Sequence, residues 1–246
     1  MYVQVACSYA DNKLNNRDKL LMAMQLEKVV PFGRSLDEYI KMFALSEADF
    51  NQRILGVGDG PASFNAEATK LGFNITSIDP IYQFSGAEIL ARFNTVVDNI
   101  INQVKATPHD WVWSYHQSPD DLRHNREQAI KKFIDDYDQG KLKGRYVNQE
   151  LPKLNFQDKE LDLALCSHFL FLYSDHYDYQ FHLNSIIEML RVAQEVRIFP
   201  LLTLMLQRSP YLDKVIQQLG EMGYSVSIVK VEYEFQKGGN EMLVIK

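Results

Sequence analysis

The chain has 246 residues, and its 26 Lys and Arg residues against 32 Asp and Glu residues give a formal net charge of −6. Hydrophobic residues make up 46% and charged residues 24% of the sequence. These values are ordinary for a soluble globular protein and exclude disorder as the main state, because disorder requires low hydrophobicity and a high net charge. At this length one large α/β domain, or one domain with an elaboration, is expected.

Charge and cysteine usage restrict the partners and the compartment. An acidic chain argues against a nucleic-acid partner, because neutralisation of phosphates supplies much of the affinity in such complexes. Cys7 and Cys166 show no zinc-type spacing, and no metal is expected. Residues 1–15 lack the order of a signal peptide, and the apolar run 163–174 is too short to span a bilayer. We therefore expect a cytoplasmic protein that does not enter the membrane.

Helices are expected before the first clear strand. Apolar residues recur at helical spacing from Leu20 to Val30, and Pro31-Phe32-Gly33 ends that run. Ser35-Leu36-Asp37-Glu38 has the order of a capping box that opens another helix. We predict an N-terminal helical extension over residues 1–52 and a main domain over residues 53–246.

A strand, a glycine turn, a helix and a second strand follow. The strand 53–57 runs into Gly58-Asp59-Gly60-Pro61, a helix is expected over 62–71, and the strand 74–78 stops at Asp79-Pro80. A glycine turn lets a ligand approach the backbone, and the next helix N-terminus offers free N–H groups. The acid about 20 residues after the turn has the spacing of a carboxylate that binds ribose hydroxyls. Together they predict an adenosine-type ligand.

The rest of the chain predicts a long helical insert and then renewed alternation of strands and helices. Residues 82–142 contain no convincing strand, and the second insert helix is expected to run from its cap Ser118 to Gly140. The last two strands must be antiparallel, because the turn at 237–240 is short. The other expected elements are helices at 87–104, 181–192 and 210–222 and strands at 145–149, 162–166, 195–199, 225–235 and 241–246.

Two other nucleotide-binding motifs are excluded. The dinucleotide fingerprint G-x-G-x-x-G/A fails, because its last position would fall on Pro61 or Ser63. No G-K-[ST] follows the turn, as a P-loop would require.

Five features in chain order resemble the class I S-adenosylmethionine-dependent methyltransferases, in particular their type 11 group. Residues 54–62 look like the first motif of that family, and Asp79 matches its ribose-binding acid. Residues 149–156 resemble the segment between its third and fourth strands, 161–166 resemble its fourth-strand motif, and the terminal hairpin is similar to its last two strands. The resemblance implies a Rossmann-like α/β fold: a mostly parallel seven-stranded sheet with an antiparallel C-terminal strand, helices on both faces and the helical insert at about 82–142.

The resemblance also implies the residues that would hold S-adenosylmethionine. The glycine turn would line the methionine moiety, and Asp79 would accept both ribose hydroxyls. Pro80 or Ile81 would flank the adenine, and Asn148 or Gln149 would approach its edge. The implied cofactor-binding residues are Gly56, Val57, Gly58, Asp59, Gly60, Asp79, Pro80, Asn148, Gln149, Cys166 and Ser167.

One position departs from the family pattern. The family usually has an acid where this chain has Gly56, and that acid helps to hold the methionine amino group. Either another residue, with Asp59 as a candidate, substitutes for it, or the affinity for the cofactor is reduced. A non-catalytic binding module with the same fold therefore stays open as an alternative.

Methyl transfer from a sulfonium needs little covalent help, because the methyl group is already activated and alignment and desolvation supply most of the rate. Cys166-Ser167-His168-Phe169 stands where the family's amino-group methyltransferases carry an (Asp/Asn)-Pro-Pro-(Tyr/Phe) run. His168 is the catalytic candidate, as a base for an oxygen or carbon acceptor, with a structural role as the alternative. We expect a small-molecule acceptor; a protein or RNA substrate is the alternative.

Two further groups of side chains have alternative interpretations. Trp111, Trp113 and Tyr115 either stack on an acceptor or pack the insert onto the core. The group Asp175, His176, Asp178 and His182 matches no metal-site spacing, and a solvated loop is the preferred interpretation.

Overall fold

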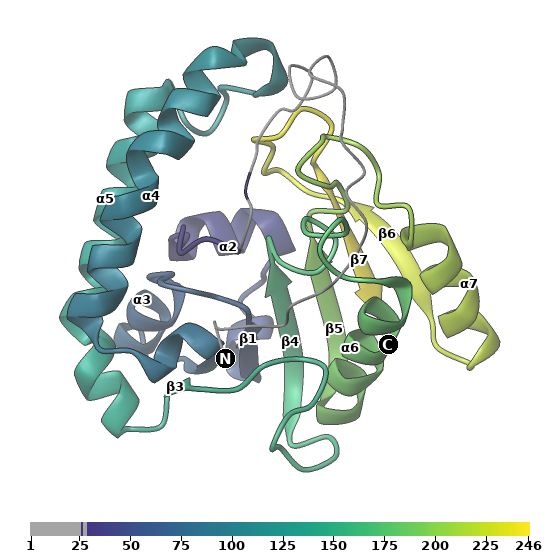
Figure 1. Ribbon diagram of the computed structural model, residues 1–246. Coiled ribbons are helices and arrows are strands. Elements are labelled where there is room, and N and C mark those ends of the chain that lie inside the picture. Colours follow the sequence, from purple (N-terminus) through teal and green to yellow (C-terminus); the bar gives the residue numbers. More distant parts are fainter. Residues whose placement is uncertain (1–25, 27–28) are drawn as a thin grey trace, which may run out of the picture.

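A seven-stranded sheet forms the centre of the protein. The computed structural model describes residue 26 and residues 29–246 (Figure 1). The strand order is β3-β2-β1-β4-β5-β7-β6, and β7 runs antiparallel to both of its neighbours. This is the fold that the resemblance implies, and the predicted fold class is confirmed. The strands are β1 (Arg53–Val57), β2 (Asn74–Ile78), β3 (Tyr146–Val147), β4 (Leu161–Ser167), β5 (Ala193–Phe199), β6 (Val226–Lys230) and β7 (Glu241–Ile245).

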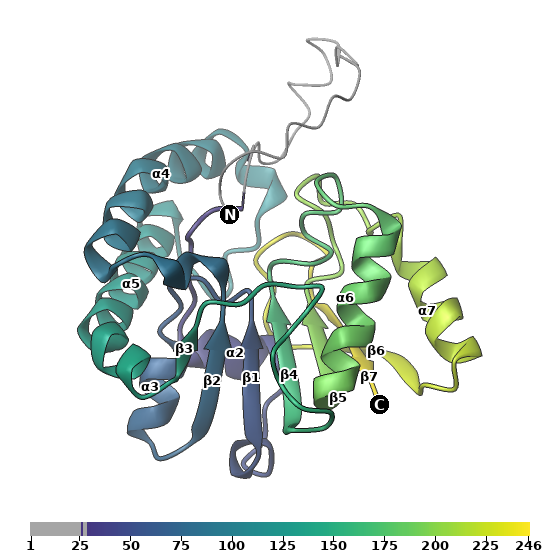
Figure 2. The same cartoon turned by 60° about the horizontal axis from the view of Figure 1, so that its bottom comes forward.

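Helices cover both faces of the sheet (Figure 2). The α-helices are α2 (Leu36–Phe43), α3 (Phe64–Lys70), α4 (Gly86–Ala106), α5 (Pro119–Leu142), α6 (Tyr179–Val192) and α7 (Leu212–Glu221). One hydrophobic cluster joins helices α2 to α5 to one face, and a second cluster joins α6 and α7 to the other face. Short 3₁₀ helices are η1 (Asp49–Asn51), η2 (Pro80–Gln83) and η3 (Pro108–Asp110). No helix of the described residues has the length and apolar character needed to cross a membrane.

The strands bury side chains on both faces, because successive residues point to opposite sides. In β4, Leu163 and Leu165 belong to the cluster with α2 to α5, and Ala164 and Cys166 belong to the cluster with α6 and α7. All four side chains are completely buried. Strands with two buried faces read as continuous apolar runs, which is why β4 was recognisable in the sequence.

Helix α2 starts where the sequence predicts. The Ser35 hydroxyl accepts from the Glu38 N–H, and the Glu38 carboxylate accepts from the Ser35 N–H, so the capping box is complete. The buried apolar residues of α2 belong to the same cluster as Phe64 and Ala68 of α3 and apolar residues of the sheet. Most of the helix predicted for 20–30, namely residues 20–25 and 27–28, lies outside the described residues.

The insert forms a helical hairpin. Helices α4 and α5 replace any strand between β2 and β3, and Ser118 caps α5 by accepting from the Asp121 N–H, as predicted. The hairpin rises along one side of the sheet and continues beyond the ends of the strands (Figure 1). It therefore forms one wall of the space above the carboxyl ends of the strands.

Two predicted strands are longer than the observed ones. The predicted strand 225–235 is wrong beyond Lys230, because Tyr233 and Phe235 turn away from the sheet edge and bury their rings in the cluster with α2 to α5. The predicted strand 145–149 shrinks to β3. Its partner β2 ends at Ile78, and Pro80 has no N–H with which to continue the ladder.

Candidate functional site

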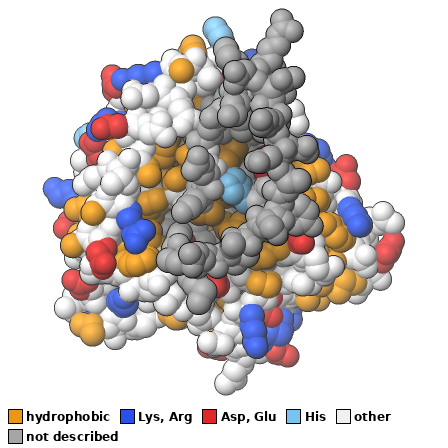
Figure 3. Space-filling view, in the orientation of Figure 1, with side chains coloured by type: hydrophobic (Ala, Val, Ile, Leu, Met, Phe, Trp, Pro, Cys, Tyr) orange, Lys and Arg blue, Asp and Glu red, His pale blue; other side chains and the backbone are white. Residues whose placement is uncertain are grey.

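A cavity lies where the carboxyl ends of β1, β2 and β4 face the insert hairpin. Figure 3 shows hydrophobic side chains gathered on this face of the molecule. The residues that follow the strands contribute Gly58, Asp59, Gly60, Asp79, Ile81, Ser167 and His168. The insert contributes Ile100, Val104, Trp111, Leu122 and Arg126. The remaining described lining residues are Leu26, Val29, Val30, Pro31, Phe32, Arg34, Tyr39, Leu172, Tyr173, Leu204, Phe235 and Gln236.

The glycine turn and the predicted ribose acid meet in this cavity. Gly58 and Gly60 have φ values of 67° and 54°, a left-handed conformation that favours glycine. The Gly60 N–H donates to Asp79 Oδ2 at 2.9 Å, and the Ile81 N–H donates to Asp79 Oδ1 at 2.8 Å. Burial raises the pKa of Asp79 to about 6, although both backbone hydrogen bonds favour its charged form. The turn and the acid therefore form one pre-organised unit.

Asp59 occupies the space that an acid at position 56 would need. A Cβ atom added to Gly56 would overlap the carboxylate of Asp59. This carboxylate accepts from the Tyr39 hydroxyl at 2.6 Å and from the Ser77 hydroxyl at 2.6 Å. Asp59, three residues after Gly56, thus places its carboxylate where an acid at position 56 would lie. Its hydrogen bond with Tyr39 also connects α2 to the glycine turn.

Burial raises the pKa of Asp59 from 3.8 to about 7. Between these pH values the folded state holds a proton that the unfolded chain has lost, so rising pH lowers the free energy of unfolding. We expect ionisation of Asp59 to lower the free energy of unfolding by up to about 1.4 kcal/mol per pH unit. This decrease should end above pH 7, where Asp59 is ionised in both states. Asp59→Asn should remove that part of the slope in urea unfolding measured at pH 4.5, 5.5, 6.5 and 7.5. Equal slopes in both proteins would contradict the raised pKa of Asp59.

The other residues expected to hold the cofactor are divided between the cavity and its surroundings. Ser167 lines the cavity, whereas Cys166 and Val57 are buried in the core beneath it. Burial raises the pKa of the Cys166 thiol to about 12, so this side chain stays a neutral thiol. Asn148 and Gln149 follow β3 and do not line the cavity, and Pro80 begins η2 next to Asp79 without lining it.

His168 lies at the end of β4 and faces the cavity. Its backbone is left-handed, with φ 50°, and its Nδ1 lies 3.0 Å from the Ser167 hydroxyl. Burial, together with the cations of Arg34 and Arg126, holds the pKa of His168 well below its usual range. The imidazole is therefore neutral at neutral pH, and its protonated form is strongly disfavoured.

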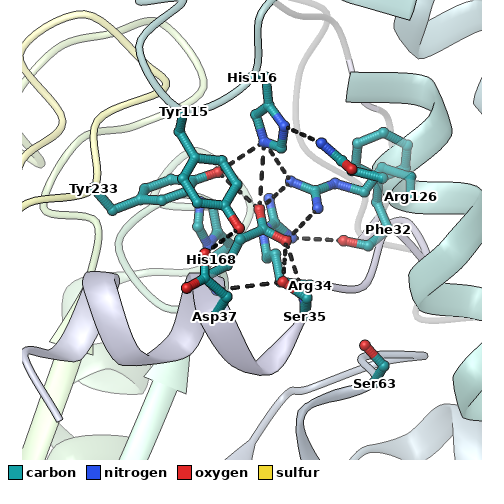
Figure 4. A network of polar contacts seen from close by, with 12 residues as sticks. Phe32, Arg34, Ser35, Asp37, Ser63, Tyr115, His116, Arg126, His168 and Tyr233 are labelled. Atoms are coloured by element: carbon teal, nitrogen blue, oxygen red, sulfur yellow. Dashed lines mark hydrogen bonds and ion pairs between the residues drawn. The ribbon is translucent and has the colours of Figure 1, made fainter. Parts of the chain in front are cut away.

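A buried polar network lies next to the cavity, and the sequence patterns did not predict it. Figure 4 shows Arg34, His116, Arg126 and Tyr233 converging from separate segments. Arg126 donates to both oxygens of Glu38 at 2.7 Å, and both side chains are 1% exposed. The Tyr233 hydroxyl donates to Glu38 Oε1 at 2.9 Å and lies 3.3 Å from His116 Nε2. The capping pattern identified Glu38 as a helix residue, but no sequence spacing connects it with Arg126.

The aromatic residues of the insert pack onto the loop after β6. Trp111 stacks on Phe235 with ring centroids 4.7 Å apart, and Trp113 meets the same ring edge-on. The Tyr115 hydroxyl donates to Asp37 at 2.7 Å. Trp111 also lines the cavity, so packing and contact with a ligand are compatible for this residue. In the part of the chain that the structure describes, no group of three or more His, Cys, Asp and Glu residues could hold a metal ion.

Comparisons with solved structures find partial likenesses at low sequence identity. The PH0226 protein of Pyrococcus horikoshii OT3 is 9% identical over 89% of this chain and 96% of that one, with a TM-score of 0.46. Magnesium protoporphyrin IX methyltransferase of Synechocystis PCC 6803, crystallised with bound SAM, is 13% identical over 85% of this chain and 76% of that one, with a TM-score of 0.42. The fold assignment rests on the strand order of the sheet.

Sequence comparison establishes a family. No protein-family model matches the chain. The uncharacterized protein MJ0045 of Methanocaldococcus jannaschii is 38% identical over 224 residues, which cover 91% of this chain and 98% of that protein. The chain belongs to the same protein family as MJ0045.

Proposed function

We propose that the protein is an S-adenosylmethionine-dependent methyltransferase with a small-molecule acceptor. One observation carries the proposal: the left-handed glycine turn after β1 donates a backbone hydrogen bond of 2.9 Å to Asp79 after β2, and both line one cavity. A turn with two glycines beside a buried carboxylate suits the methionine and ribose parts of an adenosyl ligand.

Asp79 is equipped to bind ribose hydroxyls. Each of its oxygens accepts one backbone N–H, and an ionised carboxylate has about four acceptor sites in total. Acceptor capacity therefore remains for two hydroxyl groups. The backbone hydrogen bonds also fix the orientation of the carboxylate before a ligand arrives, which reduces the entropy lost on binding.

The glycine at position 56 does not favour the non-catalytic alternative. The carboxylate of Asp59 fills the space beneath the turn that an acid at 56 would occupy. Asp59 lines the cavity and its pKa of about 7 leaves it partly ionised at neutral pH. A cationic ammonium or sulfonium group nearby would lower that pKa and favour the carboxylate. Asp59 is thus our candidate for the missing acid.

The apolar part of the cavity supports a small-molecule acceptor. Its walls come from the insert hairpin and from the loops after β4, β5 and β6. Because these walls are apolar, we propose an acceptor with an apolar body. S-adenosylmethionine, when bound, supplies an activated methyl group. The strongly lowered pKa of His168 makes it a weak base, so we assign it the positioning of the acceptor at the end of β4. The apolar walls of the cavity are formed by Ile100, Val104, Trp111, Leu122, Leu172, Leu204 and Phe235.

Calorimetric titration with S-adenosylmethionine and S-adenosylhomocysteine tests the proposal. We expect micromolar binding of both, and Asp79→Ala should weaken it by about 1–3 kcal/mol, since charged hydrogen bonds to the ribose are lost. Asp213→Ala, an exposed acid on α7, is the matched control and should bind as the original protein does. Absence of binding up to millimolar ligand by the folded protein would contradict the proposal, and unchanged affinity of Asp79→Ala would contradict the ribose assignment.

A further inference from the structure

Arg34 is a cation of the cavity that has no acidic partner among the residues that the structure describes. Its Nη1 donates to the Phe32 carbonyl at 2.6 Å, and its buried Nε has no hydrogen-bond partner among the described residues. No carboxylate of residue 26 or residues 29–246 lies within ion-pair distance of Arg34. The neighbouring Arg126 differs in this respect, because Glu38 neutralises it through two hydrogen bonds.

The charge of Arg34 persists at neutral pH. Burial and the cation of Arg126 lower the pKa of Arg34 to about 10, which still lies well above 7. A desolvated charge without a counter-ion is unfavourable, and an anion entering the cavity would relieve that cost. The planar guanidinium with its free Nε is suited to pair with a carboxylate, which it can bind through two parallel hydrogen bonds.

The backbone places Arg34 against the glycine turn. A Cβ atom on Gly33 would overlap the backbone of Pro61, and the Ser63 N–H donates to the Arg34 carbonyl at 3.0 Å. The side chain reaches towards His168 at the end of β4, and the two residues line the same cavity (Figure 4). In the sheet, β2 and β4 flank β1 on opposite sides. The Arg34 side chain lies near His168, which follows β4, whereas Asp79 follows β2.

We propose that Arg34 binds the carboxylate at the amino-acid end of the adenosyl ligand and so distinguishes the complete cofactor from adenosyl compounds that lack this group. The inference rests on the proposed function, because it assigns one end of the same ligand. Asp79 and Arg34 would then hold opposite ends of the molecule, with the glycine turn between them.

A cycle of two proteins and two ligands tests this role. The original protein and Arg34→Gln are titrated with S-adenosylhomocysteine and with its decarboxylated analogue, in which the carboxylate alone is missing. We expect Arg34→Gln to bind S-adenosylhomocysteine about 10- to 100-fold more weakly and to bind the analogue with unchanged affinity. Arg34→Lys keeps the charge and should recover part of the loss. Arg53→Gln, at the opposite end of β1, is the matched control and should bind both ligands normally.

Each other result overturns the assignment. Equal affinities of the original protein for the two ligands would show that the carboxylate is not recognised, and this comparison needs no variant. An equal loss of affinity for both ligands in Arg34→Gln would indicate that the substitution disturbs the structure of the site and does not remove a contact with the carboxylate. Unchanged binding of both ligands by Arg34→Gln would show that Arg34 does not contact the cofactor, and its charge would then be available to an acidic acceptor. These three results leave the proposed function intact, whereas failure of the original protein to bind either adenosyl ligand would remove the proposed function itself.

Discussion

Arg126→Met is expected to lower the free energy of unfolding by about 3–5 kcal/mol, because it leaves the Glu38 carboxylate buried without its cation. Both side chains are 1% exposed, so water cannot replace the lost partner. The pair joins α2 to the insert helix α5, and Tyr233 connects it to the loop after β6. We therefore expect the loss to appear as a lower midpoint in urea unfolding, with the slope preserved.

Arg123→Met provides the matched control on the same helix. Arg123 pairs with Asp98 and Glu127, but its side chain is 38% exposed. Exposed pairs contribute about 1 kcal/mol or less, so this variant should change the unfolding free energy only slightly. The combined variant Glu38→Leu/Arg126→Met removes both charges and should be more stable than Arg126→Met alone. Similar effects of Arg126→Met and Arg123→Met would contradict the role of burial.

Gly56→Asp is expected to destabilise the protein by about 3 kcal/mol, although it introduces the acid that the family pattern favours. The new Cβ would overlap the Asp59 carboxylate, which must then leave the Tyr39 and Ser77 hydroxyls. Two hydrogen bonds to the Asp59 carboxyl group are lost, each of which contributes on the order of 1–2 kcal/mol. Urea unfolding measures the change, and calorimetry shows whether S-adenosylhomocysteine still binds.

A second substitution shows whether the two positions share one space. In Gly56→Asp/Asp59→Ala the new acid has room, so we expect at least half of the lost stability to return and the two effects to be strongly non-additive. Gly220→Asp on α7 is the matched control, because no atom lies within 4 Å of a Cβ added there. Additive losses in the double variant would contradict the substitution of Asp59 for the acid at position 56.

The sequence by itself determined the order of the elements and one end of the candidate site. β1 and β2 were located to the residue, and Ser35 and Ser118 cap the helices that they were predicted to cap. The glycine turn and Asp79 were also found, because their spacing is set by a single strand–helix–strand unit. Such features depend on local hydrogen bonds and on periodicity, which are written in neighbouring residues.

Only the tertiary structure decided the remainder of the site. Glu38 and Arg126 are 88 residues apart, and their pairing depends on how α2 and α5 pack rather than on any spacing along the chain. That Arg34 has no acidic partner in the described part of the chain is visible only once those carboxylates are placed in three dimensions. The strand β6 ends early because Tyr233 and Phe235 gain more burial in the core than at an exposed sheet edge. Long-range burial and charge compensation compete with local propensity, and here they decide which side chains enter the cavity.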